Sequence, residues 1–438
     1  MSRLAYTVIL TLAMPVLILR LLWRSLRMPA YRARIGERFA LHAPQFASGL
    51  RADARDRLIW IHAVSVGEVA AAEPLINALL QEYPDLCIVL TTMTPTGAQR
   101  AESVLGQRVS HCYVPYDLPF LLGRFIRALK PDLVVLMETE LWPNLIHACH
   151  RRDIPLLLAN GRLSAKSAQN YRRIARVARQ MLSSLNRIGA QSQDDADRFV
   201  FLGAGEHRVL VTGSLKFQLA NGAATESGAP IFAALKAATR PIIIAASTRE
   251  GEEAKVLDGL SSVWQSRPDV LLLLVPRHPQ RFDEVAKLCI SRNLKVQRRS
   301  EYQQSDSQKN GRGLAADVQV LLGDSMGEMP DYYRCADIAF VGGSLVDTGC
   351  QNVLEPAALA IPVITGPSQY NFAAICRQLE DAGALHTVDD EQTLARYCLE
   401  LLDAPDQRAA MGAAGKALVD ANQQALPAHL SLVAQLLV

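Results

Sequence analysis

Acidic side chains follow two apolar runs of the sequence, at points where they could accept or donate protons. Glu68 ends the motif HAVSVGE, which leads from the apolar run 58–64 into a helical pattern. Glu138 and Glu140 lie in the motif ETELWPN, which begins where the apolar run 133–137 ends. Two carboxylates beside a tryptophan and a proline are costly to bury without a function, so we expect acid–base chemistry here. The alternative for Glu68 is a first-turn carboxylate that only complements the helix dipole.

One lysine and two polar loops in the same half of the chain are candidates for ligand contacts. Lys216 lies in TGSLKF, Arg162 follows another apolar run in NGRLS, and hydroxyl groups crowd the loop TTMTPTG at 91–97. Hydroxyl and backbone N–H groups of this kind can bind a phosphate or a sugar. A solvated surface lysine and a threonine helix cap are the alternative interpretations.

Basic and glycine-rich turns recur in the second half of the chain. Arg249 lies in STREGEE and Arg277 in VPRHP, and later turns read GDSMGE at 323–328 and GGS at 342–344. Helix starts with free N–H groups and a nearby arginine favour a phosphate-bearing ligand. The sequence has no GxxxxGK[ST] motif and no GxGxxG after its first apolar run, which argues against an ATPase and a dinucleotide-dependent dehydrogenase.

Short apolar runs must position these side chains, and they alternate with segments of helical period. The expected strands are 58–64, 87–92, 133–138, 155–160, 187–191, 241–246, 270–275, 318–322, 338–341 and 362–365. This alternation predicts the α/β class, with two doubly wound parallel sheets and a cleft between their domains. Ligands of such sheets bind beyond the carboxyl ends of the strands, which is where the polar turns stand.

The length of 438 residues suits two domains joined by the alanine- and glycine-rich segment 218–240. The expected first domain spans 31–217 and the second 241–438, with the last helix a candidate to return to the first domain. A hydrophobic fraction of 50% excludes a disordered or fibrous chain, and a net charge of +3 is low for a nucleic-acid binder. The eight cysteines form no CxxC pair and no zinc spacing, so we expect buried thiols in a reducing compartment and no metal site.

The amino-terminal segment 1–30 is predicted to attach to a membrane. Residues 4–19 carry no charge, and Arg20, Arg24 and Arg27 follow. Sixteen uncharged residues are marginal for a bilayer span, so a short span and an interfacial helix both remain open. The positive-inside rule places the body of the protein in the cytoplasm. A secretory signal lacks its cleavage site here, and a buried helix of a soluble core is the other alternative.

The motifs together closely resemble the 3-deoxy-D-manno-octulosonic acid (Kdo) transferases of Gram-negative bacteria. The resemblance covers nearly the whole chain and rests on HAVSVGE, TTMTPTG, ETELWPN, TGSLKF, VPRHPQRF, GGSLVDTGCQNVLEPA and the early segments PAYR and RIGERF. It implies a GT-B glycosyltransferase with two Rossmann-like domains, which transfers Kdo from CMP-Kdo to a lipid A precursor (lipid IVA) with inversion and without a cofactor. It also implies a place at the cytoplasmic face of the inner membrane, with the arginines between Arg20 and Arg38 against the anionic lipid surface.

The resemblance also assigns roles to residues of this sequence. Glu68 matches the family's catalytic base, which we expect to be ionised at neutral pH, and Glu138 and Lys216 match its transition-state stabilisers. Lys216 and Arg277 would offset the negative charge that gathers as CMP leaves. The positions that match the family's CMP contacts are Pro276, Arg277, Met326, Gly327, Glu328, Asn352, Val353, Leu354 and Glu355.

Two departures from the family pattern fall in the expected donor domain. Where relatives usually read GGHNPLEP, this chain has Gln351 and Val353 within GCQNVLEP at 349–356, and Arg249 stands where histidine is common.

Two other functions remain open. One is another GT-B nucleotide-sugar enzyme, such as an epimerase or a hexosamine transferase, and the other is a two-lobed binding protein without catalysis.

Overall fold

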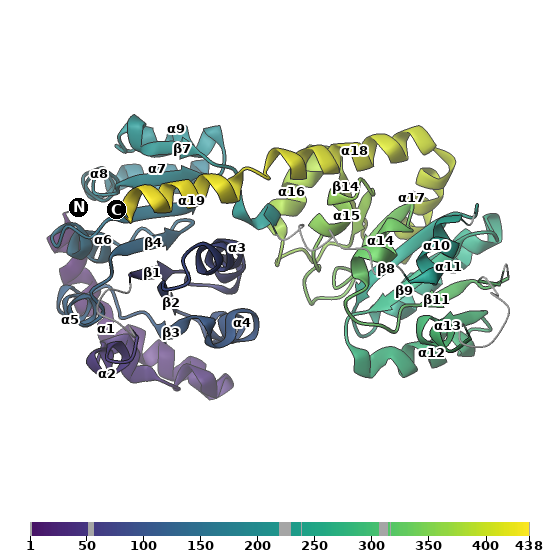
Figure 1. The fold of residues 1–438 in the computed structure, drawn as a ribbon, viewed down its shortest axis with the longest axis horizontal. Coiled ribbons are helices and arrows are strands. Elements are labelled where there is room, and N and C mark those ends of the chain that lie inside the picture. Colours follow the sequence, from purple (N-terminus) through teal and green to yellow (C-terminus); the bar gives the residue numbers. More distant parts are fainter. Residues whose placement is uncertain are drawn as a thin grey trace. The chain divides into compact units, whose positions relative to one another are not determined.

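Two units make up the fold of this chain (Figure 1). The computed structural model describes residues 2–50, 57–218, 229–237, 239–305, 314–315 and 317–437. One unit contains Met1–Gln218 and Asn422–Val438, and the other contains Leu219–Ala421. Each unit is a parallel seven-stranded sheet between layers of helices, which confirms the predicted α/β class.

The sheet of the first unit has the strand order β3-β2-β1-β4-β5-β6-β7, and all of its strand pairs are parallel. Its central strands are continuous apolar runs because helices cover both of their faces. The strands are β1 (Leu58–His62), β2 (Cys87–Thr92), β3 (Ser110–Tyr113), β4 (Leu133–Met137), β5 (Leu156–Gly161), β6 (Arg187–Ala190) and β7 (Val209–Val211).

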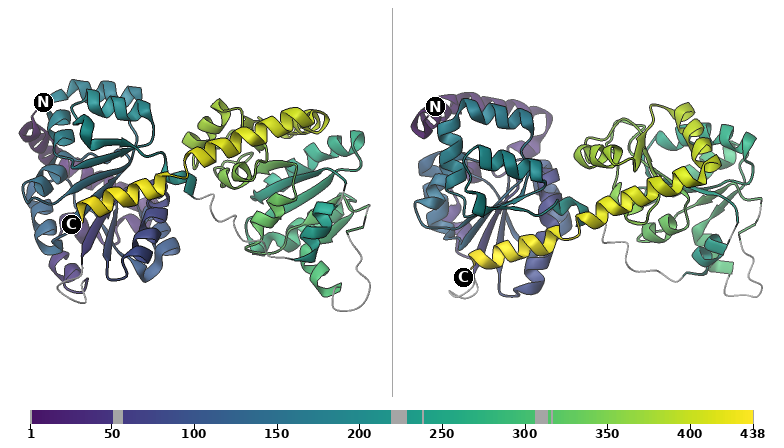
Figure 2. Two further views of the ribbon diagram at one scale, coloured as in Figure 1. Left: turned by 45° about the horizontal axis from the view of Figure 1, so that its top comes forward. Right: turned by 90° about the horizontal axis from the view of Figure 1, so that it is seen from above.

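Helices cover this sheet in two layers. On one face α2, α5, α6, α7, α8 and α9 pack on Trp60, Leu136 and Leu158, and on the other face α3, α4 and α19 pack on Ile61 and Val135. Figure 2 shows α19, in yellow, across this unit. The helices are α1 (Arg3–Arg27), α2 (Ala43–Ala47), α3 (Val66–Glu82), α4 (Pro95–Leu105), α5 (Pro119–Leu129), α6 (Pro143–His150), α7 (Ala165–Arg173), α8 (Ala175–Ser183), α9 (Gln193–Phe201) and α19 (Ala425–Leu436).

The second unit repeats this architecture with the strand order β10-β11-β9-β8-β12-β13-β14. Its strands are β8 (Ile242–Thr248), β9 (Leu271–Pro276), β10 (Val296–Arg298), β11 (Val320–Leu322), β12 (Ile338–Val341), β13 (Val363–Thr365) and β14 (Leu385–Thr387). Its helices are α10 (Pro230–Ala237), α11 (Glu252–Ser266), α12 (Phe282–Ser291), α13 (Arg299–Ser305), α14 (Met329–Arg334), α15 (Leu354–Ala358), α16 (Ala373–Asp381), α17 (Glu391–Asp403) and α18 (Pro405–Ala421).

The strands that the sequence pattern did not predict are the four outermost ones, β3 and β7 in one sheet and β10 and β14 in the other. Each has three or four residues, and β7 and β10 contain no buried residue. An outermost strand pairs on one side only and is commonly short and polar, so it lacks the continuous apolar run by which a central strand is recognised.

The first boundary differs from the expected one at residues 229–237, and the last helix lies in the first unit, a placement that the sequence left as a candidate. Residues 229–237 of the expected linker 218–240 include α10, whose Ile231, Phe232 and Leu235 are buried in the core of the second unit. The chain after Ala421 belongs to the first unit, because Leu432 and Val433 of α19 pack with that unit's strands. The second unit therefore ends before residue 438.

Helix α1 lies along the first unit with one face against it. Met14 and Leu21 are buried, and Met14 packs on Tyr116 and Leu121. The opposite face leaves large apolar side chains exposed: Leu4, Val8, Ile9, Leu12, Val16, Leu19, Leu22, Trp23 and Leu26. By length and composition Arg3–Leu26 could cross a membrane, with a mean hydropathy of 2.0 and only 11% of that window buried.

Candidate functional site

The carboxylates singled out in the sequence meet at the carboxyl edge of the first sheet. Strands β1 and β4 are neighbours at the point where the strand order reverses, and ligands of doubly wound sheets bind outside the strands at such a point. Glu68 lies in the first turn of α3, which follows β1, and Glu138 directly follows β4. The local fold thus brings two of the predicted site residues to one edge.

Glu68 is a buried carboxylate with two local hydrogen-bond donors. Its Oε2 accepts from the backbone N–H of Val64 at 2.6 Å, and its Oε1 accepts from the hydroxyl of Ser65 at 2.9 Å. Burial raises the pKa of Glu68 to about 8, helped by the negative charges of Glu140 and Glu138, although the two donors oppose the shift. The expectation of an ionised carboxylate at neutral pH stays a prediction, and the burial of Glu68 favours its protonated form.

Glu138 forms an ion pair with Lys216. Its backbone has a positive φ of 52°, an uncommon conformation outside glycine, and its N–H donates to the carbonyl of Ala159 at 3.0 Å. The Nζ of Lys216 lies 2.6 Å from Oε1 of Glu138, with side chains 22% and 16% exposed. Lys216 is thus not the freely solvated lysine that the sequence left open, and it balances one carboxylate of the cluster.

Asn160, at the end of β5, positions the turn that carries Lys216. Its Oδ1 accepts from the backbone N–H of Leu215 at 3.0 Å. Its own N–H donates to Nε2 of His429, and the ring nitrogen Nδ1 of His429 lies 2.6 Å from the carbonyl of Ala425. Burial lowers the pKa of His429 to about 4, so the ring is neutral, donates through Nδ1–H and accepts at Nε2. No motif of the sequence marked this contact, because it joins β5 to a helix 269 positions further along the chain.

Helix α19 approaches the sheet closely where His429 reaches Asn160. A Cβ atom added to Gly189 of β6 would lie 2.8 Å from Nε2 of His429. The glycine in β6 therefore makes room for the imidazole ring.

Two aromatic side chains, Trp142 and His62, lie next to Glu140. The indole N–H of Trp142 donates to Oε2 of Glu140 at 2.7 Å, and the indole ring lies edge-on to His62, with centroids 4.8 Å apart. His62 is fully buried, and burial lowers its pKa to about 3, so the ring is neutral. Burial and the charge of Glu138 raise the pKa of Glu140. The sequence analysis assigned no role to Glu140. The structure shows that its negative charge helps to raise the pKa of Glu68.

This arrangement suits proton abstraction near an anionic group. Three carboxylates with one lysine among them disfavour full ionisation, so one of them holds a proton near neutral pH. A base whose pKa lies near the working pH transfers protons efficiently. The ammonium group of Lys216 is a fixed positive charge in the same cluster.

The two polar loops of the first unit have different outcomes. Thr94 caps α4, with its hydroxyl accepting from the N–H of Gly97 and Pro95 at the first helical position, so the helix-cap interpretation of this loop is confirmed. Arg162 is exposed after β5.

Basic residues gather at the carboxyl edge of the second sheet. Arg249 follows β8, and Arg277 and His278 follow β9, its neighbour. Burial and the charge of Arg277 lower the pKa of Arg249, whose guanidinium group contacts Nε2 of His278. Nε of Arg249 is buried and has no hydrogen-bond partner among the described residues. Two neighbouring cations with an unused donor are suited to an anion.

The expected donor residues after β11 and β12 lie on both sides of this basic group. Met326 is 59% exposed, Gly327 has a positive φ of 83°, and the carboxylate of Glu328 is held by Arg299 at 2.8 and 3.1 Å. The carboxylate of Glu328 is thus held by Arg299, and its backbone carbonyl accepts from the N–H groups of Asp331 and Tyr332. The partner Arg299 was not recognised in the sequence, where no motif surrounds it.

The stretch from Asn352 to Glu355 is folded by its own side chains. Nδ2 of Asn352 donates to Oε1 of Glu355 at 3.0 Å, and Oδ1 of Asn352 accepts from the N–H of Leu354. Burial raises the pKa of Glu355, although Asn352 and the charge of Arg277 lower it. Glu355 and Arg277 therefore lie close enough to interact, while Val353 and Leu354 are buried in the core and Pro276 is buried at the end of β9.

Glu252 is a structural anchor that the sequence did not single out. It is fully buried, and its carboxylate accepts the backbone N–H groups of Gly343, Ser344 and Leu345 at 2.6 to 2.9 Å. The carboxylate therefore fixes the GGS turn, and it leaves those N–H groups unavailable for the phosphate that this turn was expected to bind. Within the parts of the chain that the structure describes, no group of three or more His, Cys, Asp or Glu is placed to hold a metal ion.

Comparisons with known proteins bear on both units. Residues 33–219 match the family model of 3-deoxy-D-manno-octulosonic-acid transferase (kdotransferase), and residues 245–418 match that of glycosyl transferases group 1. The chain is 40% identical over 434 residues to the 3-deoxy-D-manno-octulosonic acid transferase of Haemophilus influenzae, covering 99% of this chain and 98% of the relative. It is 38% identical to that of Bordetella pertussis, covering 95% of each chain.

Among solved structures, the UDP-GlcNAc 2-epimerase of Neisseria meningitidis bound to UDP-GlcNAc is similar in fold. The TM-score is 0.52 with 13% sequence identity, covering 86% of this chain and all of the other. At that identity the likeness concerns the fold alone.

Proposed function

The chain belongs to the 3-deoxy-D-manno-octulosonic acid (Kdo) transferase family of GT-B glycosyltransferases, and from this premise we propose that it transfers Kdo from CMP-Kdo to a lipid A precursor such as lipid IVA. The observation that carries the proposal is the cluster at the β1 and β4 ends, where Glu68 lies with Glu138 and Lys216. It joins a buried base to a fixed cation, the two groups that transfer of an anionic sugar to a hydroxyl acceptor requires.

In the proposed reaction a sugar hydroxyl of the acceptor attacks the anomeric carbon of Kdo. The new carbon–oxygen bond forms as the bond from that carbon to the phosphate oxygen of CMP breaks, and CMP leaves with the bonding electrons. Glu68 takes the hydroxyl proton, which requires its ionised form. Attack on the face opposite the leaving group inverts the anomeric configuration.

Lys216 and Glu138 act on the charges of this transition state. Kdo carries its own carboxylate and CMP leaves as a phosphate, so negative charge accumulates as the bond breaks. The ammonium group of Lys216 offsets part of that charge better than water would, because its position is fixed by Glu138 and by the turn on Asn160.

We assign the donor nucleotide to the second unit. Arg249 and Arg277 supply neighbouring cations for the phosphate, and Glu355 supplies an acceptor for ribose hydroxyls. Met326, Gly327 and Glu328 and the stretch from Asn352 to Glu355 are the proposed CMP contacts. Gln351 and Val353, which depart from the family pattern, leave the bond between Asn352 and Glu355 intact.

We assign the membrane contact to α1. Because its packed face holds it against the first unit, the exposed leucines and valines favour an interfacial helix over a free span. Arg20 and Arg24 follow on the exposed side and suit the anionic headgroups of the inner membrane at its cytoplasmic face.

The experiment that tests the proposal is incubation of the purified full chain with CMP-Kdo and tetra-acylated lipid A precursor, with products read by mass. A mass increase by one or more Kdo units is expected. Thermal protection by CMP but not by UDP is the accompanying binding test, and the reverse preference would indicate another nucleotide-sugar enzyme of the same fold.

A further inference from the structure

An apolar cavity of about 420 Å³ lies between α1 and the helices α7 and α8 of the first unit. Tyr6, Leu10 and Leu17 line it from α1. Its opposite wall includes Val177 and Met181 of α8. The cavity has the size of a small-molecule site rather than a packing defect, because a single water occupies only about 30 Å³.

The lining is mostly apolar, and its polar side chains are Asp117, Trp142 and three tyrosines, Tyr6, Tyr116 and Tyr171. Its one charged residue is Asp117, whose two carboxylate oxygens accept the backbone N–H groups of Asn144 and Leu145 at 3.1 and 2.8 Å. Asp117 is therefore already used to fix the start of α6. A ligand for this cavity has to be apolar over the length that it buries.

One end of the cavity adjoins the carboxylate cluster. Trp142 lines the cavity, and its indole N–H donates to Glu140, the residue whose charge acts on Glu68. Tyr171 also lines the cavity, and burial together with the charge of Glu140 raises the pKa of its hydroxyl. A chain in the cavity thus ends beside the proposed site of transfer.

Helix α1 also carries an apolar surface on the side that faces away from the cavity. The helix presents Leu10 and Leu17 to the cavity and Leu12 and Leu19 to the outside, at 75% and 65% exposure. A surface of this kind rarely faces water on a soluble protein and marks a membrane or a partner.

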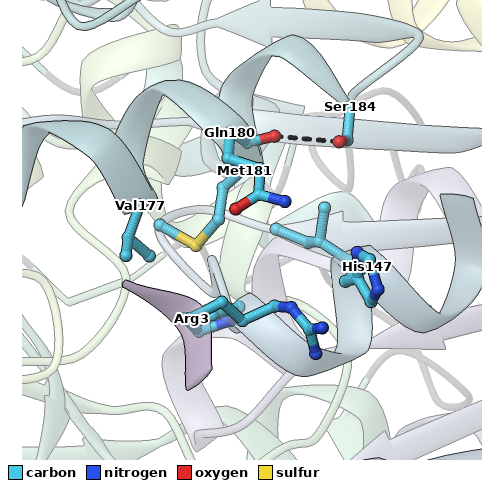
Figure 3. A pocket seen from close by; sticks show the side chains of 8 residues that line it. Arg3, His147, Val177, Gln180, Met181 and Ser184 are labelled. Carbon is cyan, nitrogen blue, oxygen red and sulfur yellow. Dashed lines mark hydrogen bonds between the residues drawn. The ribbon is translucent and has the colours of Figure 1, made fainter. Parts of the chain in front are cut away.

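A second, much smaller hollow adjoins the same helices but does not extend the site. Arg3 and His147 line it, together with Val177 and Met181 of α8 (Figure 3). Its volume of about 10 Å³ is room for one water at most.

We propose that this cavity binds one acyl chain of the acceptor lipid, which enters along α1 and ends beside Trp142. The inference rests on the proposed function, because it deepens the recognition of that same acceptor. Chain binding next to the carboxylates places the acceptor sugar at Glu68 while its remaining chains stay in the bilayer. It accounts for an apolar cavity that the chemistry of transfer does not itself require.

Binding is tested without catalysis by the fluorescence of Trp142. The full chain in alkyl maltoside micelles is titrated with a dibrominated C18 fatty acid, whose bromines quench indole emission on contact. The wild type is expected to show a saturable loss that Trp142→Phe lacks, whereas Trp23 on the exposed face of α1 is quenched equally in both. Equal quenching of the two proteins overturns the proposal.

Kinetics then separate the cavity from the transfer reaction. Leu10→Trp and Ile174→Trp each fill the cavity from a half-buried position. Each is expected to raise KM for the tetra-acylated acceptor at least tenfold, since each methylene lost from an apolar site costs about fourfold. KM for CMP-Kdo and turnover of a fully deacylated acceptor should stay at the wild-type values, and Leu12→Trp on the exposed face is the matched control. Equal losses of activity on both acceptors, or no loss on either, overturn the acyl site. A wild type that transfers Kdo to neither acceptor contradicts the proposed function. In that case the quenching experiment still decides whether the cavity binds an acyl chain.

Discussion

The Nζ of Lys216 lies 2.6 Å from Oε1 of Glu138, and both side chains are mostly shielded from water. Each residue comes from a different turn at the carboxyl edge of one sheet. Because Glu138 fixes the ammonium group and neutralises part of its charge, the two should act as one unit in the reaction.

Replacing one residue of this ion pair should lower turnover, and replacing both should lower it little further. Lys216→Met is expected to reduce kcat about 10²- to 10³-fold, the range seen when one fixed electrostatic stabiliser is removed. The double variant Glu138→Gln/Lys216→Met should be no slower than the worse single variant, measured at saturating CMP-Kdo and acceptor. Multiplicative losses would show that the two residues act independently.

The pH dependence of the reaction should report the raised pKa of Glu68. The active form is the ionised carboxylate, so kcat/KM is expected to rise with pH through about 8. Glu140→Gln removes the nearby negative charge, which should move this limb to lower pH. A limb that stays at the same pH in Glu140→Gln would contradict the electrostatic coupling.

The same group should make folding stability fall as pH rises. The folded pKa of about 8 exceeds the ordinary value of 4.5, so between these limits the folded state holds a proton that the unfolded chain has lost. Glu68→Gln has no carboxyl group that titrates at this position, so its stability should not fall in this way. We expect the Tm of Glu68→Gln minus that of the wild type to increase from pH 5 to pH 9. A constant Tm difference would argue against a buried, protonated carboxylate.

His429 should support Lys216 through Asn160. His429→Ala leaves the N–H of Asn160 unpaired in the core, which costs about 1–3 kcal/mol, and it loosens the turn of Lys216. We expect a lower Tm and a lower kcat with KM for CMP-Kdo unchanged. The ring of His429 binds a second proton less readily in the folded protein than in the unfolded chain. The stability of the wild type should therefore fall as the pH drops from 6.5 toward 4. The stability of His429→Gln should fall less over the same range.

The arginines after the apolar part of α1 should affect acceptor recognition alone. Arg20→Glu/Arg24→Glu is expected to raise the apparent KM for the lipid acceptor several-fold and to leave that for CMP-Kdo unchanged, because anionic headgroups attract these residues. Lys287→Glu/Arg396→Glu, two exposed positions on helices of the second unit, is the control with the same change in charge. Equal effects on both substrates would count against a membrane role.

The sequence predicted the fold well where strands are buried on both faces. The apolar runs of β1, β2 and β4 stand out because helices cover them, and the resemblance to Kdo transferases is confirmed by family models and relatives. The outermost strands could not be recognised in this way. The last helix could be named only as a candidate to return to the first domain, because contacts such as that of His429 with Asn160 are not encoded in any local pattern.

The candidate site was predictable in its residues and less so in their state. The motifs named Glu68, Glu138 and Lys216, and the topology brings them to one edge of the sheet. The protonation of Glu68 follows from its burial beside Glu140, which depends on where the β4 turn folds. Electrostatic shifts of this kind require the distances between groups and cannot be derived from a sequence alone.

The central claim is that Glu68 is the base of Kdo transfer, and one comparison tests it most directly. Wild type and Glu68→Gln are incubated with CMP-Kdo and tetra-acylated lipid A precursor, with product masses followed over time and CMP binding measured in parallel. The prediction is a loss of transfer by several orders of magnitude in Glu68→Gln, with CMP affinity unchanged. Transfer at the wild-type rate by a folded, CMP-binding Glu68→Gln would contradict it.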